Sequence, residues 1–297
     1  MIAVGEETHF KKSLVDARIK IIKELVTEHQ IDIIAIEGSI NVSHIINEYV
    51  SGQTQSIIFH EVLPGLNEPY LLQGAGLYDC EQMIEFIEWL REFNSKRKNK
   101  ITFAGFDFQN FSVPIDSLQK YSNGDIEINY KLSSIQTTLR KSILSILDSG
   151  INVIATRNWL ETFRSARKDL KYVERQIFSD ENAIFFDELK QFTNLWDAPS
   201  FPRDSLMFEN LKKISRNENV IVLAANYHLE NDPLFKGPKK MGTFLREYFN
   251  ENYLAIGLKE DQNSAIRLKN PKIVDDKKLD IVIFVSQGEK CNRIYRK

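Results

Sequence analysis

The sequence predicts a three-layer α/β/α fold, in which a mainly parallel β-sheet lies between helices and carries an inserted helical segment. Short apolar runs alternate with amphipathic helical patterns over residues 1–114 and again over residues 216–297, which is typical of α/β proteins. Over residues 115–215 the strand signal fades and long helical patterns replace it. We therefore expect one domain over residues 1–297, with a sheet built from both ends of the chain.

The predicted strands are short and rich in β-branched residues. Residues 31–36 read Ile-Asp-Ile-Ile-Ala-Ile, and a nearly continuous run of this kind indicates a central strand that is buried on both faces. Further strands are expected at residues 2–4, 101–106, 220–224, 253–256 and 281–285.

The predicted helices have apolar residues at helical spacing among charged ones. In the sheet region they cover residues 14–25 and 83–93, and in the insertion residues 132–147 and 159–178. The insertion also carries an aromatic-rich stretch, which either packs into its core or forms the wall of a pocket for a large apolar substrate. Its members are Phe185, Phe186, Phe192, Trp196 and Phe201.

Composition excludes several functional classes. The chain has 39 basic and 41 acidic residues and a formal net charge of −2, without the basic stripe that nucleic-acid binding needs, so we expect no nucleic-acid partner. No apolar run reaches the length of a membrane span. The first residues also lack the basic and apolar regions of a signal peptide, which predicts a cytoplasmic location and no membrane partner. Cys80 and Cys291 are the only cysteines and do not have the close spacing of a zinc site.

Charged or polar residues follow the ends of four predicted strands. In an open parallel sheet the carboxyl ends of the strands form the ligand crevice, so side chains placed there converge although they are distant in sequence. The sequence therefore predicts a cluster of imidazoles and carboxylates. Its members are Glu6 and His9 after the first strand, Glu37 after the second, Asp107 after the third, and Asn226 and His228 after the fourth.

Each of these residues also has a purely structural explanation. His9 either accepts a proton or is a hydrogen-bonded polar side chain near a helix start. Glu37 ends a strongly apolar strand and needs a partner, so it belongs either to a structural ion pair or to a functional site. Arg18 could hold an acidic group in the crevice or pair along its own helix. Asp204, after Arg203, is expected to be the N-cap of a helix.

Other catalytic chemistries lack their motifs in this sequence. There is no HExxH zinc motif, no GxSxG nucleophile elbow and no glycine-rich phosphate loop before a helix. The remaining chemistry is the activation of water by a histidine and carboxylates, for which we expect no metal and no cofactor.

Several short blocks occur in an order and at an approximate spacing that resemble the erythromycin esterases, over nearly the whole chain. They are Gly5-Glu6-Glu7-Thr8-His9-Phe10, Arg18, Ile36-Glu37, Trp89-Leu90-Arg91 with Asn94, Gly105-Phe106-Asp107-Phe108-Gln109, Arg203-Asp204 with Met207 and Asn210, Asn226-Tyr227-His228, and Met241-Gly242 with Leu245.

This resemblance implies a hydrolase that opens the lactone ester of 14-membered macrolides without a covalent acyl-enzyme, giving antibiotic resistance or detoxification. It implies that His9 is the general base on water and that Glu6 and Glu37 orient the base or the water. Arg18 would be their charge partner, and His228 the second histidine. The residues expected to bind the substrate are Asp107, Asn226 and Arg203.

One departure from the family pattern favours a second hypothesis. Members commonly have a His-Asn-x-His arrangement after the fourth strand, whereas this chain has Ala225-Asn226-Tyr227-His228. The missing imidazole is expected to weaken catalysis or polar recognition. The alternative function is therefore a non-catalytic protein of the same general fold that binds a metal or a haem-like ligand in this cleft.

Overall fold

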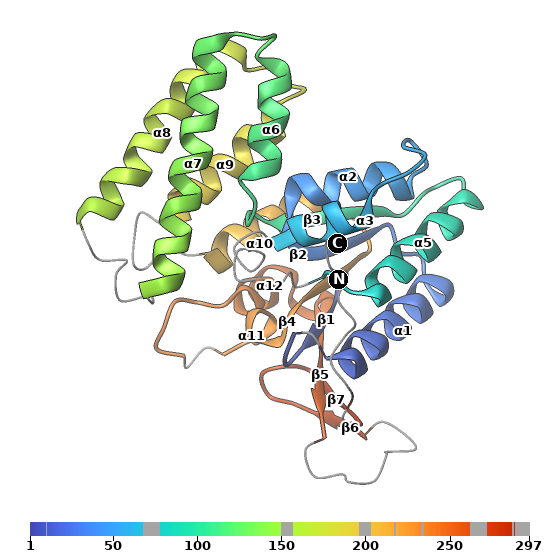
Figure 1. The fold of residues 1–297 in the computed structure, drawn as a ribbon. Helices are drawn as coiled ribbons and strands as arrows, with labels where there is room; N and C mark the ends of the chain where they lie inside the picture. The colour runs from blue at the N-terminus through green and yellow to red at the C-terminus, as the bar shows by residue number, and fades with distance from the viewer. Residues whose placement is uncertain are drawn as a thin grey trace.

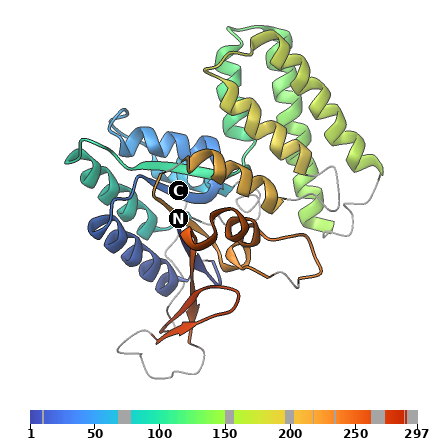
Figure 2. The ribbon, with the colours of Figure 1, turned by 180° about the vertical axis from the view of Figure 1, so that it is seen from behind.

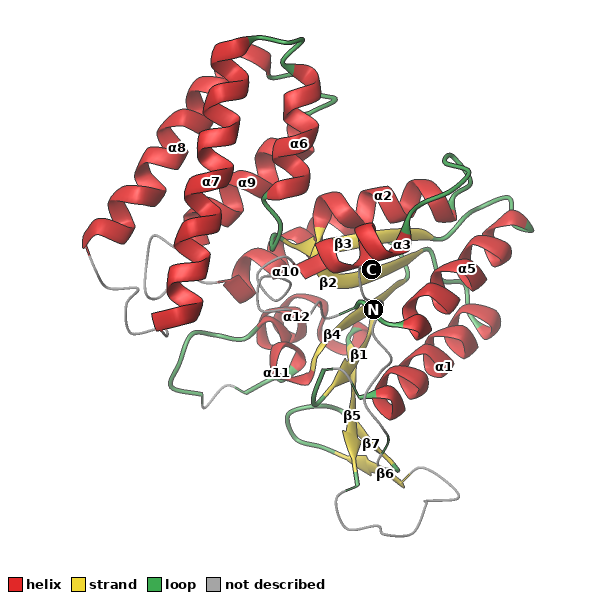
Figure 3. Cartoon of the chain, in the orientation of Figure 1, coloured by secondary structure: helices red, strands yellow, loops and turns green. Residues whose placement is uncertain are grey.

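The computed structural model describes residues 1–9, 11–67, 78–149, 157–195, 203–216, 218–232, 235–261, 272–286 and 288. Its centre is a seven-stranded sheet with the strand order β3-β2-β4-β1-β5-β7-β6 (Figures 1 and 3). All neighbouring strands are parallel except β6 and β7. The strands are β1 (Ile2–Glu6), β2 (Ile33–Ser39), β3 (Thr102–Asp107), β4 (Val220–Ala225), β5 (Leu254–Glu260), β6 (Lys272–Asp275) and β7 (Ile281–Val285).

The central strands are buried on both faces, as their apolar sequences predict. Along β2, Ile34 and Ile36 belong to one apolar cluster, whereas Ile33 and Ala35 belong to a second cluster on the opposite face. Because side chains alternate along a strand, this division shows that both faces of the sheet are covered. The three-layer α/β/α prediction is confirmed.

Helices pack on each face of the sheet (Figures 1 and 2). The face that carries Ile34 is covered by α1 (Lys12–Glu28), α2 (Ile40–Val50) and α5 (Glu81–Ser95). The other face is covered by α10 (Arg203–Ile214), α11 (Asn226–Leu229) and α12 (Met241–Phe249). Short helical turns complete the described chain: α3 (Phe59–Val62), η1 (Leu63–Asn67) and η3 (Asn250–Asn252).

Four helices form a unit that stands beside the sheet and has its own core (Figure 2). They are α6 (Ser112–Tyr121), α7 (Ile126–Ser149), α8 (Arg157–Ile177) and α9 (Ala183–Leu195). We call them the helical unit. Phe186 and Phe192 are fully buried in its core, so these two residues do not form a substrate wall. Trp196 and Phe201 lie outside the described residues. Helix α10 falls within the expected insertion but packs on β3 and α12 instead.

Several elements escaped the sequence analysis, among them a helix on the sheet, α2, and an edge strand, β6. Helix α2 begins directly after β2, with no loop between the two elements. Ser39 marks this boundary, because its Oγ accepts a hydrogen bond from Val42 N and caps the helix. Strand β6 is a short antiparallel edge strand with exposed residues. None of the helices in the described ranges is long and apolar enough to cross a bilayer.

Candidate active site

Four strand ends bring the predicted polar residues to one edge of the sheet. Glu6 ends β1, Asp107 ends β3 and Glu37 lies near the end of β2, while Asn226 follows β4 directly. The strand order places β3, β2, β4 and β1 side by side and parallel, so that their carboxyl ends lie together. The side chains then form two hydrogen-bonded groups.

The first group, the Glu6 group, consists of Glu6, His9 and Arg18. Glu6 Oε1 lies 2.8 Å from His9 Nδ1 and 3.1 Å from Arg18 Nη1. Arg18 reaches the strand end because it lies on the buried stripe of α1 with Leu14 and Ile22. Burial alone would lower the pKa of Arg18, but the charge and hydrogen bond of Glu6 together with the neighbouring Tyr78 and Cys80 outweigh this and leave the pKa above its usual value.

His9 is the accessible member of this group. Its side chain is 24% exposed, against 2% for Glu6 and 3% for Arg18. A carboxylate only accepts hydrogen bonds, so Nδ1 of a neutral His9 carries the proton and donates it to Glu6. The ring is therefore held in the tautomer whose Nε2 can accept a proton.

The second group, the Arg203 group, consists of Glu37, Asp107, Arg203, Asp204 and His228. Arg203 contacts both oxygens of Asp107, with Nε 3.3 Å from Oδ1, and its Nη2 lies 3.2 Å from Glu37 Oε1. His228 lies between two carboxylates, with Nδ1 3.0 Å from Asp204 Oδ1 and Nε2 3.4 Å from Glu37 Oε1.

These contacts shift the proton equilibria of Glu37 and His228 in opposite directions. Burial would raise the pKa of Glu37, but His228, Arg203 and the Ala225 N–H outweigh it and leave the pKa below its usual value. Burial would likewise lower the pKa of His228, but Glu37 and Asp204 leave it above its usual value. His228 is therefore suited to act as a cation, and His9 is the better candidate for a base. His9 also contributes to the lowered pKa of Glu37, which places the two groups within electrostatic reach of each other.

Two expected residues have other contacts in the structure. Asn226 donates through Nδ2 to Leu258 O at 3.0 Å, and its Oδ1 lies 2.3 Å from where a Cβ on Gly5 would stand. The side-chain amide of Asn226 therefore links α11 to β5 by a hydrogen bond and packs against β1. The prediction that Asp204 is an N-cap is wrong. It lies within the first turn of α10, and its carboxylate accepts from Met241 N and contacts His228 instead.

The sequence analysis missed Tyr78, which is 1% exposed. Among the described residues its hydroxyl has no hydrogen-bond partner, and its ring centroid lies 5.9 Å from the Arg18 guanidinium carbon. Burial, together with the charges of Glu37 and Glu6, raises its pKa well above the usual value, so the hydroxyl keeps its proton. No local pattern around Tyr78 signals this position.

Glu188 on α9 was also missed, although a signal exists. It lies three residues after Phe185 and four before Phe192, which places it on the apolar face of its helix. The side chain is fully buried, and burial raises its pKa to about 8. Such a carboxyl needs hydrogen-bond partners.

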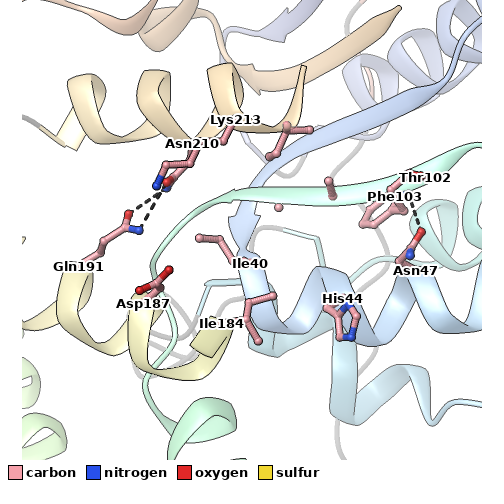
Figure 4. Close-up of a pocket in the computed structure, with 13 residues that line it drawn as sticks. Ile40, His44, Asn47, Thr102, Phe103, Ile184, Asp187, Gln191, Asn210 and Lys213 are labelled. Carbon is pink, nitrogen blue, oxygen red and sulfur yellow. Dashed lines mark hydrogen bonds between the residues drawn. The ribbon is translucent and has the colours of Figure 1, made fainter. Parts of the chain in front are cut away.

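A cavity of about 300 Å³ lies away from both groups, at the open edge of β3 between α2, α9 and α10 (Figure 4). Polar side chains at its rim include His44, Asp187, Gln191 and Lys213. None of the residues of the Glu6 and Arg203 groups lines it. In the part of the chain that the structure describes, no three His, Cys, Asp or Glu residues are placed to hold a metal ion.

Comparisons with known proteins agree on the fold. The chain is 18% identical to a mutant of the erythromycin esterase EreC in its open conformation, with a TM-score of 0.57 over 96% of this chain and 76% of that one. A succinoglycan biosynthesis protein is 16% identical, with a TM-score of 0.66 over 98% and 88%. A Bacillus cereus protein is 16% identical, with a TM-score of 0.64 over 99% and 90%.

The sequence comparisons extend to family level. The chain is 20% identical to erythromycin esterase type II of Escherichia coli over 87% of its own length and 68% of that protein. Residues 26–272 match the family model described as erythromycin esterase, a range that includes the Arg203 group, while the Glu6 group precedes it. Because this match spans most of the sheet and the helical unit, the chain belongs to the erythromycin esterase family.

Proposed function

We propose that the protein is a carboxylic ester hydrolase in which His9 activates water as a general base. One observation carries this proposal: His9 is a partly exposed imidazole, held through Nδ1 by a buried carboxylate that is itself paired with Arg18. This arrangement fixes the tautomer and supports the imidazolium that forms when Nε2 accepts a proton. A general base needs this orientation as well as access to its substrate.

The reaction begins when a water oxygen attacks the ester carbonyl carbon and gives its proton to His9 Nε2. The negative charge that develops on the carbonyl oxygen is stabilised by Arg203 and by His228, whose pKa is raised by Glu37 and Asp204 against burial. When the tetrahedral intermediate collapses, the bond to the alcohol oxygen breaks. The His9 imidazolium then returns the proton to that oxygen, so that one water is consumed and an acid and an alcohol are formed.

For the substrate we propose a macrolide lactone, which would link the protein to antibiotic resistance or detoxification. Support comes from the family and from the similarity to the type II erythromycin esterase of Escherichia coli. Arg203 contacts both carboxylate oxygens of Asp107. We therefore propose that Asp107 contributes to substrate binding by orienting Arg203. Arg203 itself, 24% exposed, is placed to contact the substrate.

The test is incubation of the purified protein with 14- and 16-membered macrolides and simple aryl esters, with mass spectrometry to detect the gain of one water. His9→Ala should lower turnover by about 10² to 10⁴, while His29→Ala, at the exposed C-cap of α1, should leave it unchanged. Unchanged turnover in His9→Ala would exclude His9 as the base. Absence of hydrolysis together with a Soret band or stoichiometric metal would favour the binding alternative.

A further inference from the structure

Glu188 links the helical unit to the sheet next to the candidate active site. Its Oε2 accepts hydrogen bonds from Ser39 Oγ at 3.0 Å, from Asn41 N at 2.9 Å and from Asn41 Nδ2 at 2.5 Å. Ser39 and Asn41 are themselves buried. The Glu188 carboxyl on α9 therefore holds the junction of β2 and α2, where Ser39 lies two residues beyond Glu37. We call this junction, residues 37–41, the β2–α2 turn.

In the β2–α2 turn, regular hydrogen bonding between β2 and β3 no longer fixes the backbone. The pairing of β2 with β3 is regular up to Ile36 and resumes at Ser39 only after a register shift, so Glu37 and Gly38 lie in the irregular segment. Gly105 shows how closely the turn approaches β3, because a Cβ there would lie 2.3 Å from Ser39 O. The position of Glu37 consequently depends on contacts outside the ladder.

A small displacement of the β2–α2 turn would change the geometry of the Arg203 group, because Glu37 contacts three partners. Its Oε1 lies 3.2 Å from Arg203 Nη2 and 3.4 Å from His228 Nε2, and its Oε2 accepts from Ala225 N at 2.8 Å. A shift of about 1 Å at such a group can lower a reaction rate by about 10². Because Glu188 holds the β2–α2 turn, its contacts influence the distances from Glu37 to Arg203 and His228.

We infer that Glu188 is a positioning residue that holds the β2–α2 turn so that Glu37 stays in contact with His228 and Arg203. The inference rests on the proposed function as far as turnover is concerned, but the placement of Glu37 is measurable without any substrate. It also gives the helical unit a direct contact with the site, through α9.

The hydrogen bonds from Ser39 and Asn41 to Glu188 need an acceptor oxygen at this position, but they do not need a negative charge. Burial raises the pKa of Glu188 to about 8 against the opposing hydrogen bonds of Asn41 and Ser39, and the charge of Asp107 adds to the rise. The neutral acid present near pH 7 keeps a carbonyl oxygen for these donors. Glu188→Gln should therefore preserve the contact, whereas Glu188→Ala should remove it.

The experiment combines NMR titration of the histidine side chains with kinetics. The His228 signal is assigned by its absence in His228→Gln. In Glu188→Ala the His228 pKa should fall toward the ordinary value of about 6.5 and kcat should fall about 10-fold to 100-fold, with KM nearly unchanged. Glu188→Gln should restore both. Glu174→Ala removes the partner of Lys190 within the helical unit and should change neither.

An unchanged His228 pKa in folded Glu188→Ala would overturn the inference, as would a Glu188→Gln variant that behaves like Glu188→Ala. If Glu188→Ala does not fold, Asn41→Ala removes one of the three hydrogen bonds, and its His228 pKa should fall in the same direction. If the unmodified protein hydrolyses no ester, the proposed function fails, while the NMR titration still decides the role of Glu188.

Discussion

Replacing Glu188 by Gln should stabilise the protein, and the gain should grow with pH. The Glu188 pKa of about 8 lies above its ordinary value of 4.5, because burial disfavours the charged form. A carboxyl whose pKa is raised by folding contributes most to stability below its unfolded pKa, and this contribution is lost as pH rises toward the folded pKa. Gln keeps the size and the acceptor oxygen but cannot ionise.

The expected size of the effect follows from the two pKa values. One pKa unit corresponds to about 1.4 kcal/mol, so the rise from 4.5 to about 8 gives an upper limit of about 5 kcal/mol at high pH. Between pH 5 and pH 7 the difference in unfolding free energy between Glu188→Gln and the unmodified protein should grow by about 2.5 kcal/mol. Other groups titrate in both proteins, so their contributions cancel in this difference.

Urea unfolding of both proteins at pH 5, 6, 7 and 8 measures this difference. Glu174→Gln is the control, because it removes a partly exposed carboxylate of the same helical unit that pairs with Lys190. It should change stability by less than about 1 kcal/mol at every pH. A difference between Glu188→Gln and the unmodified protein that stays constant from pH 5 to pH 8 would refute the reasoning.

Three further predictions concern other parts of the structure. Glu37→Gln should lower the His228 pKa, since Glu37 is the main charge that raises it against burial; an unchanged value in an NMR titration would contradict the Glu37–His228 contact. Tyr78→Phe should leave the melting temperature unchanged or higher, because a buried hydroxyl that has no hydrogen-bond partner among the described residues costs about 1–3 kcal/mol; a lower melting temperature would show that the hydroxyl is bonded. Gly242→Ala should destabilise the protein by about 1–3 kcal/mol in urea unfolding, because its Cβ would lie 2.0 Å from Leu229 O; full stability would refute this packing.

The sequence predicted the parts of the fold that depend on local patterns. Six of the seven strands appear as short apolar runs, and the parallel arrangement explains why residues at their ends meet. Glu6, Glu37 and Asp107 could be recognised in this way, because each stands where a strand stops. The blocks that resemble the erythromycin esterases then suggested which chemistry such a cluster performs.

Residues that depend on distant packing could not be predicted in this way. Glu188 and Ser39 are 149 positions apart, and no periodicity relates them. Asp204 has the composition of a helix cap, but His228 and Met241 N compete for its carboxylate in the folded protein. Among the described strands, the short β6 pairs with β7 alone, at the sheet edge, where weak burial leaves little apolar pattern to read.

The central position of β1 has a consequence for how the protein is made. Ile2 pairs with Ile221 of β4 and with Leu254 of β5, so β1 finds both neighbours only after these later strands have been synthesised. Pairings of such long sequence separation are slow to form, and strands that wait for them are open to aggregation. The Glu6 group, which follows from that strand, then assembles among the last parts of the molecule.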